Sequence, residues 1–158
     1  MNANLTTDNI KDNRKAIADT AKTLLDMISS NEIKSQDCPV THRFTPGCYL
    51  REIFMPKGTV IIGKIHATEH FNIVLKGDVT VLTAEGKERI KAPYTFTSLA
   101  GVQKVVIVHE DCVWQTTHVT DSTDLDVIEK EVITEDYSKL KVDGLLSKYK
   151  EELLCLGD

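Results

Sequence analysis

Eight short β-rich segments, each bounded by turn-forming residues, occupy most of the chain between residues 38 and 120. Glycine, proline and acidic residues recur in the separators, as in Lys76-Gly77-Asp78, and these residue types favour turns. Many short strands at close spacing are typical of a β-sandwich or a jelly roll, so the pattern predicts a mainly β domain. The predicted strands are residues 49–55, 59–66, 71–75, 79–83, 89–91, 95–97, 102–108 and 113–119.

Helical periodicity flanks this region on both sides. From residue 7 to about residue 29, apolar residues recur at helical spacing, which predicts an amphipathic helix followed by a polar linker. After residue 121 the pattern predicts a short helix near Leu125 and a longer one that includes Leu140 and Leu154. The predicted organisation is an N-terminal helix and linker (1–37), a β-barrel (38–120) and an acidic helical segment (121–158).

Charge is unevenly distributed along the chain. The 158 residues suit a single domain and carry a formal net charge of -5. Residues 121–158 hold 11 acidic and 5 basic side chains, whereas residues 38–120 hold 7 acidic and 9 basic ones. Without a run of basic residues the chain is not expected to bind a nucleic-acid polymer. A cationic pocket for one small anion remains compatible with the acidic total.

Location and redox state follow from what the sequence lacks. No stretch approaches the roughly 20 apolar residues of a membrane-spanning helix, and the first residues have no apolar signal-peptide core. The four cysteines are widely spaced and show no metal-binding or disulfide pattern. We therefore expect a cytoplasmic protein with reduced cysteines and no membrane partner.

The densest polar cluster lies between residues 63 and 77. A strand leads to His66, a short turn follows, and a second strand begins at His70. Because side chains alternate along a strand, His70 and Asn72 share a face, as do Lys64 and His66. If that face is the interior, all four side chains enter the barrel.

The order strand, histidine, short turn, strand and glycine resembles the first cupin motif, and residues 93–104 resemble a degenerate second cupin motif. In this resemblance His66 corresponds to the second histidine of the first motif and His70 to its glutamate. Lys64 and Lys104 stand where cupins place metal-binding histidines. The resemblance implies a jelly-roll barrel of the cupin (RmlC-like) type, with N-terminal and C-terminal helices packed outside it.

Residues 38–135 also resemble small, uncharacterised cupin-like proteins encoded by tailed bacteriophages. The segments that carry this resemblance are residues 41–47, 49–53, 68–70, 110–114 and 118–120. The resemblance implies a phage source, and hence the host cytoplasm as location, but no specific activity.

The lysines favour a small anionic ligand over a metal ion, because two ammonium groups repel a divalent cation. Lys64, Lys104, His66 and His70, together with Arg51, would attract a phosphate or carboxylate in a barrel mouth. We therefore predict a site for a nucleotide, a cyclic nucleotide or a sugar phosphate, with no cofactor.

Three further residues belong to the candidate site. Asn72 shares the face of His70, Trp114 is either a core residue or a stacking surface for a ring, and His118 follows Trp114 on the same strand face. A divalent metal is the alternative, held by His66, His70 and His118. The site would then be a metal centre made of three imidazoles.

Three classes of function remain open at this stage. The first is a non-enzymatic binder, which in a phage would sequester a host signalling nucleotide and counter host defence. The second is an enzyme, either a cupin-type sugar epimerase or isomerase with His66 or His70 as general base, or a metal-dependent enzyme. The third is a virion or host-interaction protein. Exposed strands and an apolar helix face predict a homo-oligomer, a dimer or larger.

Overall fold

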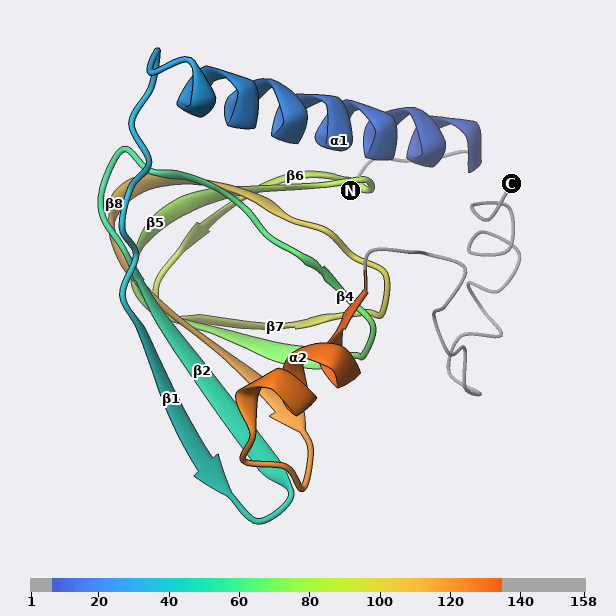
Figure 1. Cartoon of the computed structure of the whole chain (residues 1–158), viewed down its shortest axis with the longest axis vertical. Helices are drawn as coiled ribbons and strands as arrows, with labels where there is room; N and C mark the ends of the chain where they lie inside the picture. Colours follow the sequence, from blue (N-terminus) through green and yellow to red (C-terminus); the bar gives the residue numbers. More distant parts are fainter. Residues whose placement is uncertain (1–6, 135–158) are drawn as a thin grey trace.

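A computed structural model describes the backbone of residues 7–134 and the side chains of residues 12–134. About half of these residues form antiparallel strands, with one helix before the strands and one near their end (Figure 1). The predicted mainly β class with flanking helices is thereby confirmed, while the predicted helix between Leu140 and Leu154 lies outside the described residues. The elements are α1 (Thr7–Ser29), β1 (Val40–Thr45), β2 (Cys48–Met55), β3 (Val60–Ile62), β4 (Ile65–His66), β5 (His70–Thr83), β6 (Gly86–Lys91), β7 (Tyr94–Ser98), β8 (Val105–Val119), α2 (Leu125–Val132) and β9 (Ile133–Thr134).

Two long strands, β5 and β8, form the centre of the main sheet. The sheet has the order β1-β2-β8-β5-β6, with β3 also paired to β8 and β7 also paired to β5. Each long strand therefore has different outer neighbours along its two halves. This arrangement bends the sheet, so that its inner face curls around the interior (Figure 1). A separate pair, β4 and β9, joins the middle of the chain to the segment after α2.

Continuity of β5 and β8 corrects the sequence prediction. Residues 76–78 and 110–111 were expected to be turns between separate strands, and this expectation is wrong. The ladder between β5 and β8 continues through these positions with register shifts between Val74 and Val79. Such irregularities bend and twist a strand pair without ending it, so turn-forming residues here mark bulges.

A buried carboxylate lies at the same irregularity. Asp78 accepts hydrogen bonds of 2.8 and 2.9 Å from the guanidinium of Arg89, and Lys91 lies 3.5 Å away. The hydrogen bonds from Arg89 lower the pKa of Asp78. This bidentate pair compensates a charge that would otherwise be costly to bury at the bend.

Two other strand predictions need correction. The segment 59–66 contains two short strands, β3 and β4, because the chain leaves the sheet at Gly63 and Lys64. The strand β1 was not predicted, since five of its six residues are exposed and the burial alternation that reveals a strand is absent.

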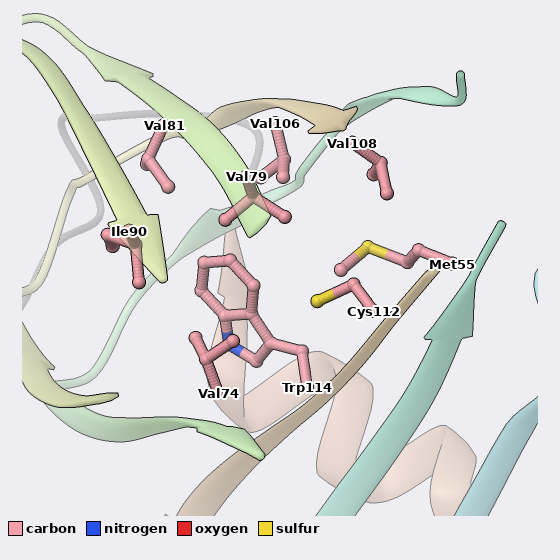
Figure 2. Packing of buried hydrophobic residues seen from close by; sticks show 9 residues of the cluster. All are labelled: Met55, Val74, Val79, Val81, Ile90, Val106, Val108, Cys112 and Trp114. Carbon is pink, nitrogen blue, oxygen red and sulfur yellow. The ribbon is translucent and has the colours of Figure 1, made fainter. Parts of the chain in front are cut away.

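The core surrounds Trp114 at the bend of the sheet (Figure 2). The indole packs edge-on against Phe96, with ring centroids 5.7 Å apart, and β-branched side chains of both long strands surround it. The nine buried side chains of this cluster are Met55, Val74, Val79, Val81, Ile90, Val106, Val108, Cys112 and Trp114.

The helix α1 lies along the end of the sheet that contains β6 (Figure 1). Ile17 is its buried apolar residue, and Asn13 donates a hydrogen bond to the Ala84 carbonyl in the β5–β6 turn. Within the described part of the chain, neither helix is long and apolar enough to cross a membrane.

Replacement of Gly77 tests the bulge. Gly77 has φ +110°, and a Cβ there would lie 2.8 Å from backbone atoms of Asp111 and Cys112. We expect Gly77→Ala to reduce the free energy of unfolding by about 3 kcal/mol or more, because both strain and overlap must be relieved. Urea unfolding measures the loss.

Gly47→Ala is the matched control. Gly47 also has a positive φ, +76°, but a Cβ there meets no atom within 4 Å. Its replacement should cost only about 1 kcal/mol from the backbone conformation. Equal losses in the two variants would contradict the close approach of β5 and β8.

Candidate ligand site

A cavity of about 520 Å³ lies between the inner face of the sheet and helix α2. Strand alternation places successive inward residues of β2, β8 and β5 in cross-strand rows, because antiparallel partners share a face. The rows change from apolar, through polar, to aromatic and imidazole side chains. They are Ile53, Trp114 and Val74, then Arg51, Thr116 and Asn72, then Tyr49, His118 and His70.

Three imidazoles gather in this structure. The ring centroids of His66 and His70 are 4.2 Å apart, those of His70 and His118 are 4.8 Å apart, and those of His66 and His118 are 5.3 Å apart. One nitrogen of each ring is buried without a hydrogen-bond partner among the described residues: Nδ1 of His66, Nε2 of His70 and Nδ1 of His118.

The tautomer of His70 follows from its surroundings. Its Nδ1 lies 3.0 Å from the carbonyl oxygen of Thr68, which can only accept, so Nδ1 carries the proton. In the neutral ring, Nε2 is then a bare acceptor directed away from that backbone contact.

All three imidazoles are neutral near pH 7. Burial is the main cause: it lowers the pKa of His66 to about 2, and those of His70 and His118 to about 4. The positive charge of Lys104 lowers all three pKa values further. Each neutral ring offers one N–H donor and one acceptor.

Two of the cationic side chains that line the cavity have no carboxylate partner among the described residues. Lys104 is 7% exposed, and burial lowers its pKa to about 8. Burial also lowers the pKa of Arg51. Within the part of the chain that the structure describes, neither side chain forms an ion pair or a side-chain hydrogen bond.

Helix α2 closes one side of the cavity. Asp124 caps its first turn by accepting hydrogen bonds from the backbone N–H groups of Asp126 and Val127, while Ile128 and Val132 pack against Tyr49. At the rim, Lys64 forms an ion pair with Glu129 of α2. The charge of Lys64 is therefore already compensated, unlike that of Lys104.

The structure brings most of the predicted site residues together. Lys64, His66, Lys104, Arg51 and His118 line the same cavity, as do Asn72 and Trp114. Residue His70 packs behind them, against His66 and His118, and is 4% exposed. Whether they bind a ligand stays a prediction.

Asn72 and Trp114 form the floor of the cavity. The indole N–H of Trp114 donates to the Asn72 side-chain oxygen at 3.2 Å, and the Asn72 amide donates to the hydroxyl of Ser98 at 2.9 Å. Because their polar groups bond each other, these two side chains hold fixed positions in the floor.

Sequence reasoning missed Tyr49, Thr116 and the α2 residues. Tyr49 and Thr116 lie two positions from Arg51 and His118 on the same strands, so alternation could have found them. Nothing in the local sequence could place Glu129, since its contact with Lys64 spans 65 residues.

The imidazole cluster does not fit a divalent cation. Within residues 12–134, no three His, Cys, Asp or Glu side chains are arranged to hold a metal ion. The charges of Lys104 and Arg51 face the histidines and would repel a dication. His66, His70 and His118, the alternative metal ligands, therefore lie close together. Their geometry and the neighbouring positive charges do not suit a metal ion.

Comparison with known proteins identifies similar folds only. No family model and no curated protein sequence matches the chain. Among solved structures, KdgF from Halomonas sp. is similar over 60% of this chain and 94% of that protein, with 16% identity and a TM-score of 0.48. The cupin domain of Schizosaccharomyces pombe Cnp3 is similar over 61% of this chain and 71% of that domain's chain, with 20% identity and a TM-score of 0.47. An RmlC-like cupin from Methanocaldococcus jannaschii is similar over 59% of this chain and 89% of that protein, with 13% identity and a TM-score of 0.46. Similarity at this level carries no information on activity, ligand or assembly.

Acidification should destabilise the protein through the imidazole cluster. Between pH 6.5 and about 4, these histidines bind protons in the unfolded chain but stay neutral in the folded protein. Their contribution to the free energy of unfolding is therefore complete above pH 6.5 and is lost as the pH falls below it. At pH 5, His70 and His118 should each cost on the order of 2 kcal/mol relative to pH 7. Urea unfolding at both pH values measures this loss.

His118→Gln removes one of these titrating groups and should make the loss between pH 7 and pH 5 smaller. This window lies above the range in which Asp78, with its lowered pKa, loses its charge. An unfolding free energy that is equal at pH 7 and pH 5 would contradict the neutral, buried state of the cluster.

Proposed function

We propose that the cavity binds a small organic anion. The observation that supports this proposal is the pair of cations, Lys104 and Arg51, that line the cavity without a carboxylate partner in the described residues. A buried charge without a counter-charge is costly, and an anionic ligand would remove that cost. The low dielectric of the surroundings strengthens the attraction.

Neutral groups beside the cations supply hydrogen bonds. The Thr116 hydroxyl and one nitrogen each of His66 and His118 are buried and have no hydrogen-bond partner in the part of the chain that the structure describes. These groups suit the oxygens of a phosphate or carboxylate, which accept several hydrogen bonds at once. A cavity of about 520 Å³ is within the usual size range of small-molecule sites.

The ligand classes in this proposal are nucleotides, cyclic nucleotides and sugar phosphates. Each combines a phosphate for Arg51 and Lys104 with a ring that the floor around Trp114 could accommodate. Sequestration of a host signalling nucleotide by a phage-encoded binder is the finer form of the proposal. It rests on the phage resemblance of the sequence and on the cationic cavity.

Calorimetry with AMP, cyclic AMP, glucose 1-phosphate and inorganic phosphate tests the proposal. We expect at least one organic phosphate to bind, and Lys104→Met and Arg51→Met each to weaken it by about 10-fold or more. This is the effect of losing one charge-assisted hydrogen bond. Lys76→Met, at an exposed position of β5 outside the cavity, is the matched control and should leave the affinity unchanged.

Two outcomes would overturn the binding site. Either no member of the panel binds, or Lys76→Met weakens binding as much as Lys104→Met does. The bound ligand should also be recovered unchanged after denaturation of the protein; a new product would indicate the epimerase or isomerase alternative instead.

We also propose that the protein self-associates through the outer face of the sheet. Phe71 is 58% exposed and Val119 is 90% exposed, and Leu75 adds to this apolar surface. Size-exclusion chromatography with light scattering should give at least twice the chain mass of 17.7 kDa, and Phe71→Glu should lower it. A wild-type mass of 17.7 kDa would contradict self-association.

A further inference from the structure

Hydrogen bonds fix the backbone at Lys104 beside the cavity. The backbone N–H of Gly63 donates to the Lys104 carbonyl at 2.8 Å, and Gln103 donates from its side chain to the Gly63 carbonyl at 3.0 Å. A Cβ on Gly63 would lie 3.3 Å from the Lys104 carbonyl oxygen, so the two segments approach closely. The backbone from which the Lys104 side chain extends therefore has a fixed position in the cavity wall.

The amine of Lys104 has unusual surroundings for a lysine. It is 7% exposed and has no carboxylate partner in the described residues. The guanidinium of Arg51 lines the same cavity, as do the neutral imidazoles of His66 and His118, whose pKa values the charge of Lys104 lowers. A lysine amine desolvated in an apolar pocket can act as a nucleophile towards carbonyl compounds.

Burial also increases the neutral fraction of this amine. With its pKa lowered to about 8, Lys104 is unprotonated in about one molecule in ten at pH 7. An ordinary exposed lysine is unprotonated in fewer than about one molecule in a thousand. The difference in neutral amine is roughly 200-fold.

We propose that Nζ of Lys104 forms an imine with the carbonyl carbon of a small oxo acid whose carboxylate is bound by Arg51. This inference rests on the proposed anion site, because the carboxylate takes the place of the anion there. The apolar part of the cavity lining, which includes Ile53, Met55 and Val106, would contact the hydrocarbon part of the acid.

The condensation is balanced without an oxidant or reductant. The nitrogen lone pair of the neutral amine forms a C–N bond to the carbonyl carbon, and the C–O π electrons move to oxygen. A proton passes from nitrogen to that oxygen, which gives a carbinolamine. The hydroxyl then leaves as water together with the remaining proton of the nitrogen, while the nitrogen lone pair forms the C=N bond.

His66 and His118 are suited to carry these protons. Each is neutral near pH 7 and has a ring nitrogen that forms no hydrogen bond within residues 12–134. A neutral imidazole can accept a proton at one nitrogen and release one from the other. The reverse sequence hydrolyses the imine and restores the amine.

Reductive trapping of the full chain tests the proposal. Pyruvate and glyoxylate, each with sodium cyanoborohydride at pH 7, should add about 72 Da and about 58 Da respectively to an amine that forms an imine. Peptide mapping then locates the modification among the 15 lysines of the chain. We expect Lys104 to be modified before every exposed lysine with at least one of the two probes.

Three variants identify the origin of any labelling. Lys104→Arg keeps a cation and should abolish the rapid modification, whereas Lys76→Arg should leave it unchanged. Arg51→Met should slow modification at Lys104 by about 10-fold or more, because the carboxylate of the probe loses its partner. Labelling in proportion to exposure, with Lys104 among the slowest lysines, would overturn the proposal.

Lactate separates failure of the imine from failure of the anion site. It has the carboxylate of pyruvate but no carbonyl to condense, so it should compete with pyruvate for Arg51. If lactate or an organic phosphate binds in an Arg51-dependent manner while Lys104 is not trapped, the anion site stands and the imine is excluded. If no anion binds and nothing is trapped, both proposals fail.

Discussion

The pairing of β5 with β8 is the interaction on which the rest of the structure depends. Their ladder runs from Phe71 opposite Thr117 to Leu82 opposite Val105, and every other strand of the main sheet joins one of these two except β1, which pairs with β2. The ladder survives its own irregularity because Gly77 allows the backbones to approach and Arg89 compensates buried Asp78. That irregularity bends the sheet, and the bend brings separate parts of its inner face around one cavity.

The inner face changes character along the strands, and this change gives the cavity its chemistry. Its core end is apolar around Trp114, its middle row carries Arg51, and its far row carries His118. Burial favours the uncharged form of an imidazole but cannot neutralise a guanidinium at physiological pH. The same environment therefore yields neutral histidines, an uncompensated arginine and a lysine whose pKa is lowered to about 8. A small anion suits such a set of groups better than a divalent cation does.

Local sequence patterns predicted much of this arrangement. The helical period located α1, and β-rich runs located most of the inner strands, including those that carry Arg51, Asn72 and His118. Continuity of β5 and β8 was not predictable, because a glycine between acidic and basic residues looks the same in a turn and in a bulge. The choice between them depends on whether a distant strand offers hydrogen bonds across the irregularity, and here β8 does.

The sequence by itself determined which residue types could meet: strand alternation placed His70 with Asn72 and Trp114 with His118, because the side-chain period of a strand is fixed at two. Only the tertiary structure decided the surroundings and the charge pairing of the two lysines in the cupin-like motifs. Lys64 and Lys104 have the same side chain, but α2 brings Glu129 to Lys64 from 65 residues away, so that lysine is paired at an exposed rim. The described residues bring no carboxylate to Lys104, which is buried in the wall of the cavity. The protonation and reactivity of a lysine depend on its neighbours and its contact with water, and folding sets both.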